Sequence, residues 1–199
     1  MSSPPARSHS LERLRALLLD EGGLMASLVA PAGNGGGLTD TSTDSAPALA
    51  SDPAPALGPA QIAASGPRAE GHREDYELLI EAIYEGYLLH YGTPRVAFTE
   101  EADLGLLAGD RLYALGLAHL VALGDTEAVV ELADTITLSS LAQGAGAPEL
   151  AGAVWAAGAR ALGWGSSDAH RRAKDLTLAG DAEAIEAMRT SATGPFASP

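Results

Sequence analysis

The chain of 199 residues contains no cysteine, so no thiol is available for a disulfide or a thiolate metal site. This absence argues against a small secreted disulfide scaffold. Basic residues are also scarce, with 12 lysines and arginines against 26 acidic residues and a formal net charge of −14. Because such a surface repels nucleic-acid phosphates, we expect no nucleic-acid partner.

Long hydrophobic runs are missing as well. No uninterrupted stretch of about 18 apolar residues occurs, and we therefore expect no membrane-spanning helix. Near the N-terminus, Glu12, Arg13 and Arg15 interrupt the apolar run that a signal peptide would need. These features predict a cytoplasmic protein.

Aromatic residues are absent from residues 33–70, where glycine, proline, serine, alanine and aspartate dominate. No helical or strand period persists there, and the segment offers too little apolar area to offset the entropy of ordering it. The composition predicts a disordered linker over residues 33–70. We also expect residues 193–199 to form a disordered tail.

The N-terminal segment, residues 1–32, contains one short helix prediction from Ser10 to Leu19. Leu11, Leu14 and Leu18 follow each other at helical spacings of three and four. This helix could be a tethered docking peptide or a frayed chain end. Its terminal position favours the frayed end.

Residues 71–192 have helical periodicity throughout and form the predicted folded domain. The first helix starts near Arg73 and carries an apolar stripe and an acidic stripe. We expect the apolar stripe to face the core and the acidic stripe to face water. The apolar stripe is Tyr76, Ile80, Ile83 and Tyr87, and the acidic stripe is Glu74, Glu77, Glu81 and Glu85.

Capping and turn residues divide the rest of the domain into further helices. We expect Thr99 to cap the second helix, and Gly124 and Asp125 to end it and begin a third. Pro148 opens a fourth helix, and a last one begins near Ser167. Because strand patterns are missing, we predict an all-α fold built as a helical bundle.

A basic turn lies in the last predicted helix, and it could bind a phosphate or an acidic partner. The simpler interpretation, which we prefer, is a solvated helix face. The turn consists of His170, Arg171, Arg172 and Lys174.

The second predicted helix contains three glycines, Gly105, Gly109 and Gly116. Each costs about 1 kcal/mol relative to alanine in a helix interior, so a cluster of them indicates close approach of a neighbouring helix or a ligand. We prefer tight helix packing. Asp103 and Asp110 are seven residues apart in the same helix and therefore share one face.

A series of short motifs follows the same order as in a known family. The motifs are Leu88-Leu89-His90, Gly92-Thr93-Pro94-Arg95, Leu107-Ala108-Gly109-Asp110-Arg111-Leu112, Gly124-Asp125 and Ala142-Gln143. With them, the stretch from Leu78 to Gly144 resembles the middle of the trans-isoprenyl diphosphate synthases, the polyprenyl synthetase family. The resemblance covers about a third of the chain and implies part of the isoprenoid synthase fold.

The family holds Mg²⁺ on an allylic diphosphate with two aspartate-rich clusters, and no DDxxD motif occurs in this sequence. The resemblance implies that Asp110 is a structural element, hydrogen-bonded within the helical core. Arg95 would stand where the family binds a second diphosphate, unless it is an exposed loop residue. We assign no catalytic residue and no metal ligand. The possible ligand or structural polar positions are His90, Arg95, Asp103, Asp110 and Gln143.

Three functional hypotheses follow. The resemblance implies a non-catalytic partner or regulatory subunit of a trans-prenyltransferase, associating with a full-length synthase or with itself through the Tyr76–Leu123 helices. An alternative is a helical scaffold module without isoprenoid chemistry. A second alternative is a divergent prenyltransferase that binds Mg²⁺ through Glu100, Asp103 and Asp110. No cofactor is expected except Mg²⁺ in this last case.

Overall fold

The computed structural model describes residues 6–29 and 57–193 of the chain. Over these residues the protein is all-α, as predicted, with nine α-helices, one 3₁₀ turn and no strand beyond an isolated bridge between Val29 and Ala97. The helices are α1 Ala6–Glu21, α2 Gly23–Leu28, α3 Pro59–Ala64, α4 Arg73–Tyr91, α5 Ala102–Ala122, α6 Thr126–Gly144, α7 Pro148–Trp164, α8 Asp168–Leu178 and α9 Ala184–Thr193, and the 3₁₀ turn is η1 Pro67–Ala69.

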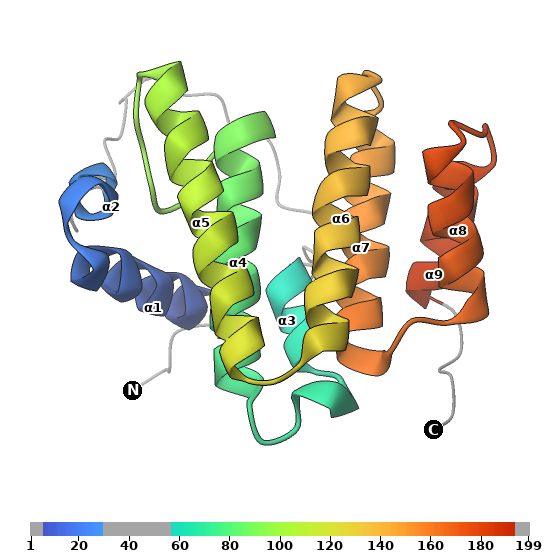
Figure 1. Ribbon diagram of the computed structural model, residues 1–199, viewed down its shortest axis with the longest axis horizontal. Coiled ribbons are helices and arrows are strands. Elements are labelled where there is room, and N and C mark those ends of the chain that lie inside the picture. Colours follow the sequence, from blue (N-terminus) through green and yellow to red (C-terminus); the bar gives the residue numbers. More distant parts are fainter. Residues whose placement is uncertain (1–5, 30–56, 194–199) are drawn as a thin grey trace, which may run out of the picture.

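The bundle is built from helix pairs that stand side by side (Figure 1). The helices α4 and α5 form one closely packed pair, and α6 and α7 form the next. The short helix α3 packs against both α4 and α7, while α1 and α2 lie at one end of the molecule and α8 and α9 at the other. The helices α5 and α6 follow each other in the chain but touch only a little.

The main core lies between α3, α4, α6 and α7 and contains the predicted apolar stripe of α4. Tyr76, Ile80, Ile83 and Tyr87 are all buried there, as the periodicity predicts. The aromatic ring of Trp155 packs edge-on against Tyr84, with 4.9 Å between the ring centroids. A single amphipathic helix therefore organises the centre of the bundle.

The N-terminal helix is part of the fold, and the prediction of a frayed end is wrong. Leu14 and Leu18 of α1 are fully buried in a second apolar cluster with Ala82 of α4 and Leu112 of α5. Arg13 of α1 also donates a hydrogen bond to the carbonyl of Glu74 over 3.1 Å. The helix docks because α4 presents apolar side chains on more than one side.

The predicted linker is also wrong in its last part, because residues 59–69 contain α3 and η1. Ala60 and Ala63 of α3 are buried, and a methyl group added to Gly66 would clash with the backbone of Gly163 in α7. Alanine and glycine lower the hydrophobicity of the segment, yet their small size allows one backbone to lie against another. The linker residues 33–56 and the tail residues 194–199 lie outside the described residues.

The acidic stripe of α4 faces water only at its start, where Glu74 is exposed, and the prediction is wrong for Glu81 and Glu85, which are buried. Glu85 is 0 % exposed, and its Oε1 accepts hydrogen bonds from the backbone N–H groups of Arg95, Val96 and Ala97 at 2.6, 2.6 and 3.2 Å. The Arg95 guanidinium lies 3.1 Å from Glu85 Oε2 and 2.7 Å from Oε2 of Glu81. The two carboxylates therefore hold the loop between α4 and α5.

Glu81 also joins α1 and α3 to α4. Its Oε1 accepts a 3.1 Å hydrogen bond from the amide of Gln61 in α3 and a 3.4 Å bond from the hydroxyl of Ser10 in α1. The Gln61 amide reaches Ser10 Oγ as well, over 3.2 Å. Buried carboxylates need such partners because an unpaired charge in the core is costly.

The glycines of α5 allow it to approach α4, as expected. A methyl group on Gly109 would lie 2.9 Å from the carbonyl oxygen of Gly86 and would also clash with His90. One on Gly116 would clash with Ile83, whereas one on Gly105 would make only ordinary contacts. Tight packing therefore explains Gly109 and Gly116 but not Gly105.

Most helix starts agree with the prediction. Asp125 caps α6 through a 2.9 Å bond from Ala128 N–H, Pro148 begins α7, and Ser167 caps α8. The prediction for Thr99 is wrong, because α5 begins three residues later at Ala102. The hydroxyl of Thr99 instead accepts the N–H of Glu101 over 3.1 Å.

One helix of the described residues, α5, is long and apolar enough to cross a membrane by length and composition alone. The sequence predicts no such segment, since Asp110 and Arg111 interrupt the helix. A helix in the core of a water-soluble bundle passes the same criterion. The packing of α5 on α4 accounts for its buried side.

The glycine packing predicts that alanine substitutions at two helical glycines change the free energy of unfolding in opposite directions. Gly109→Ala should lower the free energy of unfolding by about 1–3 kcal/mol, because the added methyl group must push α5 away from α4. Gly152 of α7 is exposed, with open space around an added methyl group. Gly152→Ala should therefore raise the free energy of unfolding by about 0.5–1 kcal/mol. Urea unfolding followed by circular dichroism measures both, and equal effects would contradict the packing account.

Removing the buried carboxylate of Glu85 should cause a larger loss of stability. Glu85→Ala should lower the free energy of unfolding by about 3–5 kcal/mol, because it leaves three backbone N–H groups and the Nε–H of Arg95 without their acceptor. The matched control is Glu74→Ala on the same helix, whose carboxylate is exposed and makes a surface ion pair with Arg13. That change should cost less than about 1 kcal/mol. Equal costs would show that Glu85 is not the anchor of this loop.

Candidate functional site

His90 and Asp110 come together where α4 packs against α5. The His90 Nε2 lies 3.0 Å from the carbonyl oxygen of Leu106 and 3.6 Å from Asp110 Oδ1. The Asp110 side chain is 73 % exposed, so the expectation of a carboxylate hydrogen-bonded within the core is wrong. The helix α5 turns Asp110 outward because its buried side is formed by glycine, alanine and leucine.

The other expected polar positions have separate surroundings. Arg95 is bound to Glu81 and Glu85 and lies 5.1 Å from the centroid of the Tyr84 ring, so it is neither a free loop residue nor available for a diphosphate. Gln143 donates a 2.6 Å hydrogen bond to the hydroxyl of Tyr87. Asp103 is exposed in the first turn of α5.

The described residues contain no group of three or more histidine, cysteine, aspartate or glutamate side chains placed to hold one metal ion. Glu100, Asp103 and Asp110, the acids of the divergent-enzyme hypothesis, are all exposed. Glu100 and Asp103 are solvated side chains at the start of α5, and Asp110 lies further along the helix beside His90.

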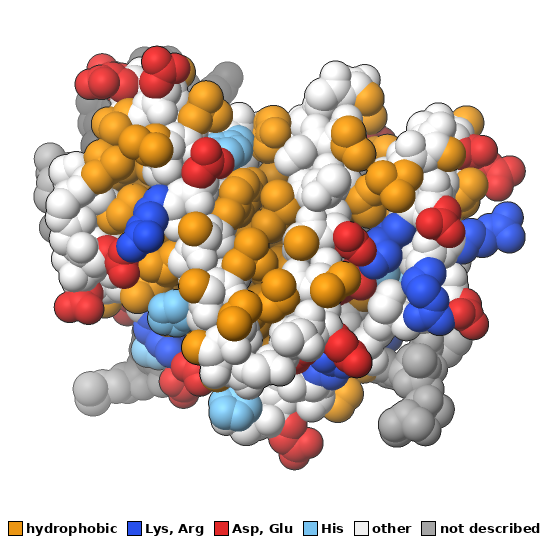
Figure 2. Space-filling model, viewed as in Figure 1, with side chains coloured by type: hydrophobic (Ala, Val, Ile, Leu, Met, Phe, Trp, Pro, Cys, Tyr) orange, Lys and Arg blue, Asp and Glu red, His pale blue; other side chains and the backbone are white. Residues whose placement is uncertain are grey.

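A surface poor in charge runs along α5 and α6. Residues 112–124 and 135–148 contain no aspartate, glutamate, lysine or arginine, although the whole chain has 38 such residues. Figure 2 shows hydrophobic side chains gathered over α5 and in the space between α5 and α6. We define the α5–α6 surface by its exposed large apolar residues, which are Leu106, Leu107, Val121, Leu123 and Leu141.

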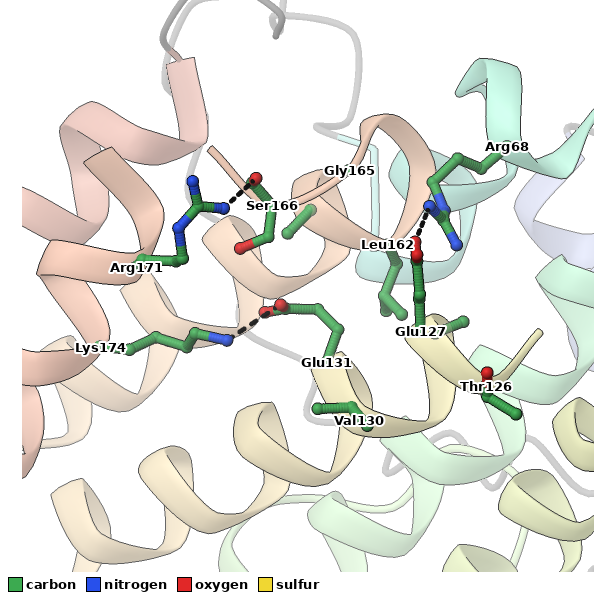
Figure 3. A pocket seen from close by; sticks show the side chains of 12 residues that line it. Arg68, Thr126, Glu127, Val130, Glu131, Leu162, Gly165, Ser166, Arg171 and Lys174 are labelled. Atoms are coloured by element: carbon green, nitrogen blue, oxygen red, sulfur yellow. Dashed lines mark hydrogen bonds and ion pairs between the residues drawn. The ribbon is translucent and has the colours of Figure 1, made fainter. Parts of the chain in front are cut away.

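A polar pocket of about 510 Å³ lies on another part of the molecule (Figure 3). Its walls are the first turns of α6, the C-terminal end of α7 and the side chains of Arg68, Arg171 and Lys174. Ser166 lies beside Arg171, whose Nη1 donates to the Ser166 carbonyl over 2.8 Å. We call this the α6–α8 pocket.

Glu131 forms the acidic centre of this pocket and of the contact between α6, α8 and α9. Its Oε1 lies 2.6 Å from His170 Nε2 and its Oε2 lies 3.0 Å from Lys174 Nζ. His170 Nδ1 reaches the hydroxyl of Ser191 over 3.3 Å. Burial raises the pKa of Glu131, but the hydrogen bonds and charges of His170 and Lys174 outweigh it and hold the pKa below its ordinary value.

A second network lies at the other side of the pocket. Arg68 Nη2 lies 2.8 Å from Asp125 Oδ1, and Nη1 lies 2.7 Å from Glu127 Oε2. The hydroxyl of Tyr76 also donates to Asp125. Burial raises the pKa of Asp125, but the hydrogen bonds from Tyr76 and Ala128 and the Arg68 charge lower it by more. The Asp125 cap of α6 is therefore tied to α4 and η1.

Sequence reasoning found only part of this pocket. The basic turn of α8 is correctly located, but its interpretation as a solvated face is wrong for His170, which is buried, and for Lys174, which bonds Glu131 and Asp134. Arg171 is exposed, as expected. Arg68 was assigned to the linker because the residues around it are small and polar.

Comparisons with known proteins add no relative, since no family model, curated protein or solved structure matches the chain.

The depressed pKa of Glu131 predicts how stability depends on pH. Its stabilising contribution is fully present above the ordinary carboxyl pKa of 4.5 and is lost as pH falls through the lower folded-state value. Glu131→Gln should therefore be less stable than the wild type at pH 7, by about 1–3 kcal/mol, with the difference shrinking below pH 4.5. The midpoints of urea unfolding of the wild type and of Glu131→Gln, from pH 7 to pH 3, measure this difference in stability.

The control for this experiment is Glu149→Gln, which changes an exposed carboxylate of α7 outside the pocket. Its stability should follow the wild-type curve at every pH. A constant difference between Glu131→Gln and the wild type across the whole range would contradict a depressed pKa.

Proposed function

We propose that the chain is a non-catalytic helical subunit that binds another protein chain through the α5–α6 surface. The observation that carries this proposal is the exposure of Leu107, Val121 and Leu141 at 58, 58 and 51 % of their surface. Contiguous exposed apolar patches are uncommon on monomers, and the centres of protein interfaces are depleted in charged residues. Hydrophobic side chains gather over α5 and between α5 and α6 (Figure 2), and Val121, Leu123 and Leu141 lie in the two stretches without charged residues.

The placement of the acids supports binding over catalysis. Ionising an allylic diphosphate requires carboxylates that converge on Mg²⁺ ions beside the leaving group. Asp110 faces solvent, and Arg95 is held by Glu81 and Glu85. The described residues thus place neither a carboxylate cluster nor a free arginine where the motifs would require them.

The partner that the motifs suggest is a full-length synthase of the polyprenyl synthetase family, in the cytoplasm. The α4 part of the Tyr76–Leu123 region is buried in the core of this chain. The proposed interface therefore combines the outer side of α5 with α6. A subunit bound there would influence isoprenoid synthesis by reshaping the synthase rather than by adding catalytic groups.

The test is co-purification of the tagged chain from its native host, with wild type and variants in parallel. Wild type should recover a prenyl synthase in near-equal amount, and a Leu107→Glu, Val121→Glu double variant should recover about tenfold less, because it buries two charges in the interface. The matched control is Leu178→Glu on α8, where the leucine is equally exposed, at 61 %, but lies outside the α5–α6 surface.

Two results would change the proposal. If the wild type recovers no synthase and runs as a monomer by light scattering, the subunit function is wrong. If a different protein is recovered and lost with the same double variant, the chain is a helical scaffold module without isoprenoid chemistry.

A further inference from the structure

The α6–α8 pocket concentrates positive charge in an acidic protein. Its lining includes three basic side chains, Arg68, Arg171 and Lys174, and two acidic ones, Glu127 and Glu131, for a lining charge of +1. The whole chain has 12 basic and 26 acidic residues. Figure 3 shows Arg171 and Lys174 on one side of the pocket and Arg68 on the other.

The pocket also contains a hydroxyl group without a partner. The Oγ atom of Ser166 is buried and makes no hydrogen bond to any described residue. A buried hydroxyl left unpaired costs about 1–3 kcal/mol, so the wall of the pocket lacks an acceptor at this point. The Arg171 guanidinium is next to Ser166, bonded to its carbonyl oxygen.

The carboxylate that pairs with Arg171 and one of the two that pair with Arg68 are exposed and can be displaced, whereas Asp125, only 19 % exposed, keeps its contact with Arg68. The Glu127 side chain is 80 % exposed, and that of Asp168, which pairs with Arg171, is 98 % exposed. Exposed ion pairs contribute little to stability and exchange readily with other anions. Glu131 competes less for an arginine, because both of its oxygens are occupied by His170 and Lys174.

The remaining walls suit a ligand with a short carbon part. Leu162, Val130 and Ala161 contribute apolar surface. The first turn of α6, with Thr126 and Ala128, also lines the pocket. A volume of about 510 Å³ lies within the usual range for small-molecule sites.

We propose that the α6–α8 pocket binds a small organic anion, whose oxyanion head is held by Arg171 and the Ser166 hydroxyl on one side of the pocket and whose carbon part contacts Leu162 and Val130. The head is a carboxylate or a phosphate ester. Its negative charge neutralises the +1 lining, and its oxygen supplies the acceptor that Ser166 lacks. This site is separate from the α5–α6 surface and does not depend on the proposed partner.

The experiment is a titration of the ¹⁵N-labelled chain with butyrate and with propyl phosphate, at constant ionic strength set with sodium chloride. Saturable shifts should appear at the amides of Thr126, Ala128 and Arg171 with a Kd of about 1 mM, the range expected for so few ligand atoms. A stronger response to one of the two probes identifies the head group and supports the site in either case.

Substitutions that are expected to change the Kd in opposite directions make the test specific. Arg171→Gln should raise the Kd about tenfold by removing a charge-assisted hydrogen bond. Glu127→Gln should lower the Kd, because it removes one negative charge from the lining of the pocket. Ser166→Ala should raise the Kd without lowering the melting temperature, because the alanine leaves no buried hydroxyl unpaired.

The matched controls are Arg189→Gln and Glu149→Gln. In the wild type, Arg189 and Glu149 form a surface ion pair over 3.2 Å, outside the pocket. Both should leave the Kd unchanged. The proposal is overturned by shifts that do not saturate, by controls that change the Kd as much as Arg171→Gln does, or by weaker binding to Glu127→Gln.

Discussion

The fold depends on one buried carboxylate more than on any other polar group. Glu85 is fully enclosed, yet it gathers three backbone N–H groups from the loop that leads into α5, and the Arg95 guanidinium balances its charge. This contact fixes the path of the chain between its two most closely packed helices. With Glu81 one turn earlier, the same side of α4 also receives α1 and α3. The central helix thus uses carboxylates to attach α1, α3 and the loop before α5.

Small residues provide the complementary part of the design. Gly86 and Gly109 bring the backbones of α4 and α5 together, and Gly66 and Gly163 do the same for the segment after α3 and for α7. Close backbone approach increases dispersion contacts without requiring bulky side chains. A chain with only 5 % aromatic residues can therefore still build a continuous core. Each of these contacts tolerates no added methyl group unless a helix moves.

Helix positions were largely predictable because apolar periodicity and capping act over a few residues, as at Asp125, Pro148 and Ser167. The burial of Glu81 and Glu85 was not predictable, because it depends on N–H groups and an arginine that lie beyond the end of their helix. Small side chains misled the composition argument at α3, where they pack rather than remain solvated. The basic turn of α8 was the only part of the pocket that the sequence indicated, because the other walls come from distant segments. Local patterns cannot indicate which charges meet in space.

The uneven distribution of charge gives the two proposed binding surfaces opposite responses to salt. Two proteins that meet at the α5–α6 surface bring together little charge at the contact, while the net charge of −14 on this chain repels an acidic partner at longer range. Added electrolyte screens that repulsion over a Debye length of about 10 Å at 0.1 M, and it strengthens apolar contact relative to charge. The same electrolyte would compete with the proposed anion for Arg171. Raising the ionic strength is therefore expected to favour the proposed protein contact over the proposed anion site.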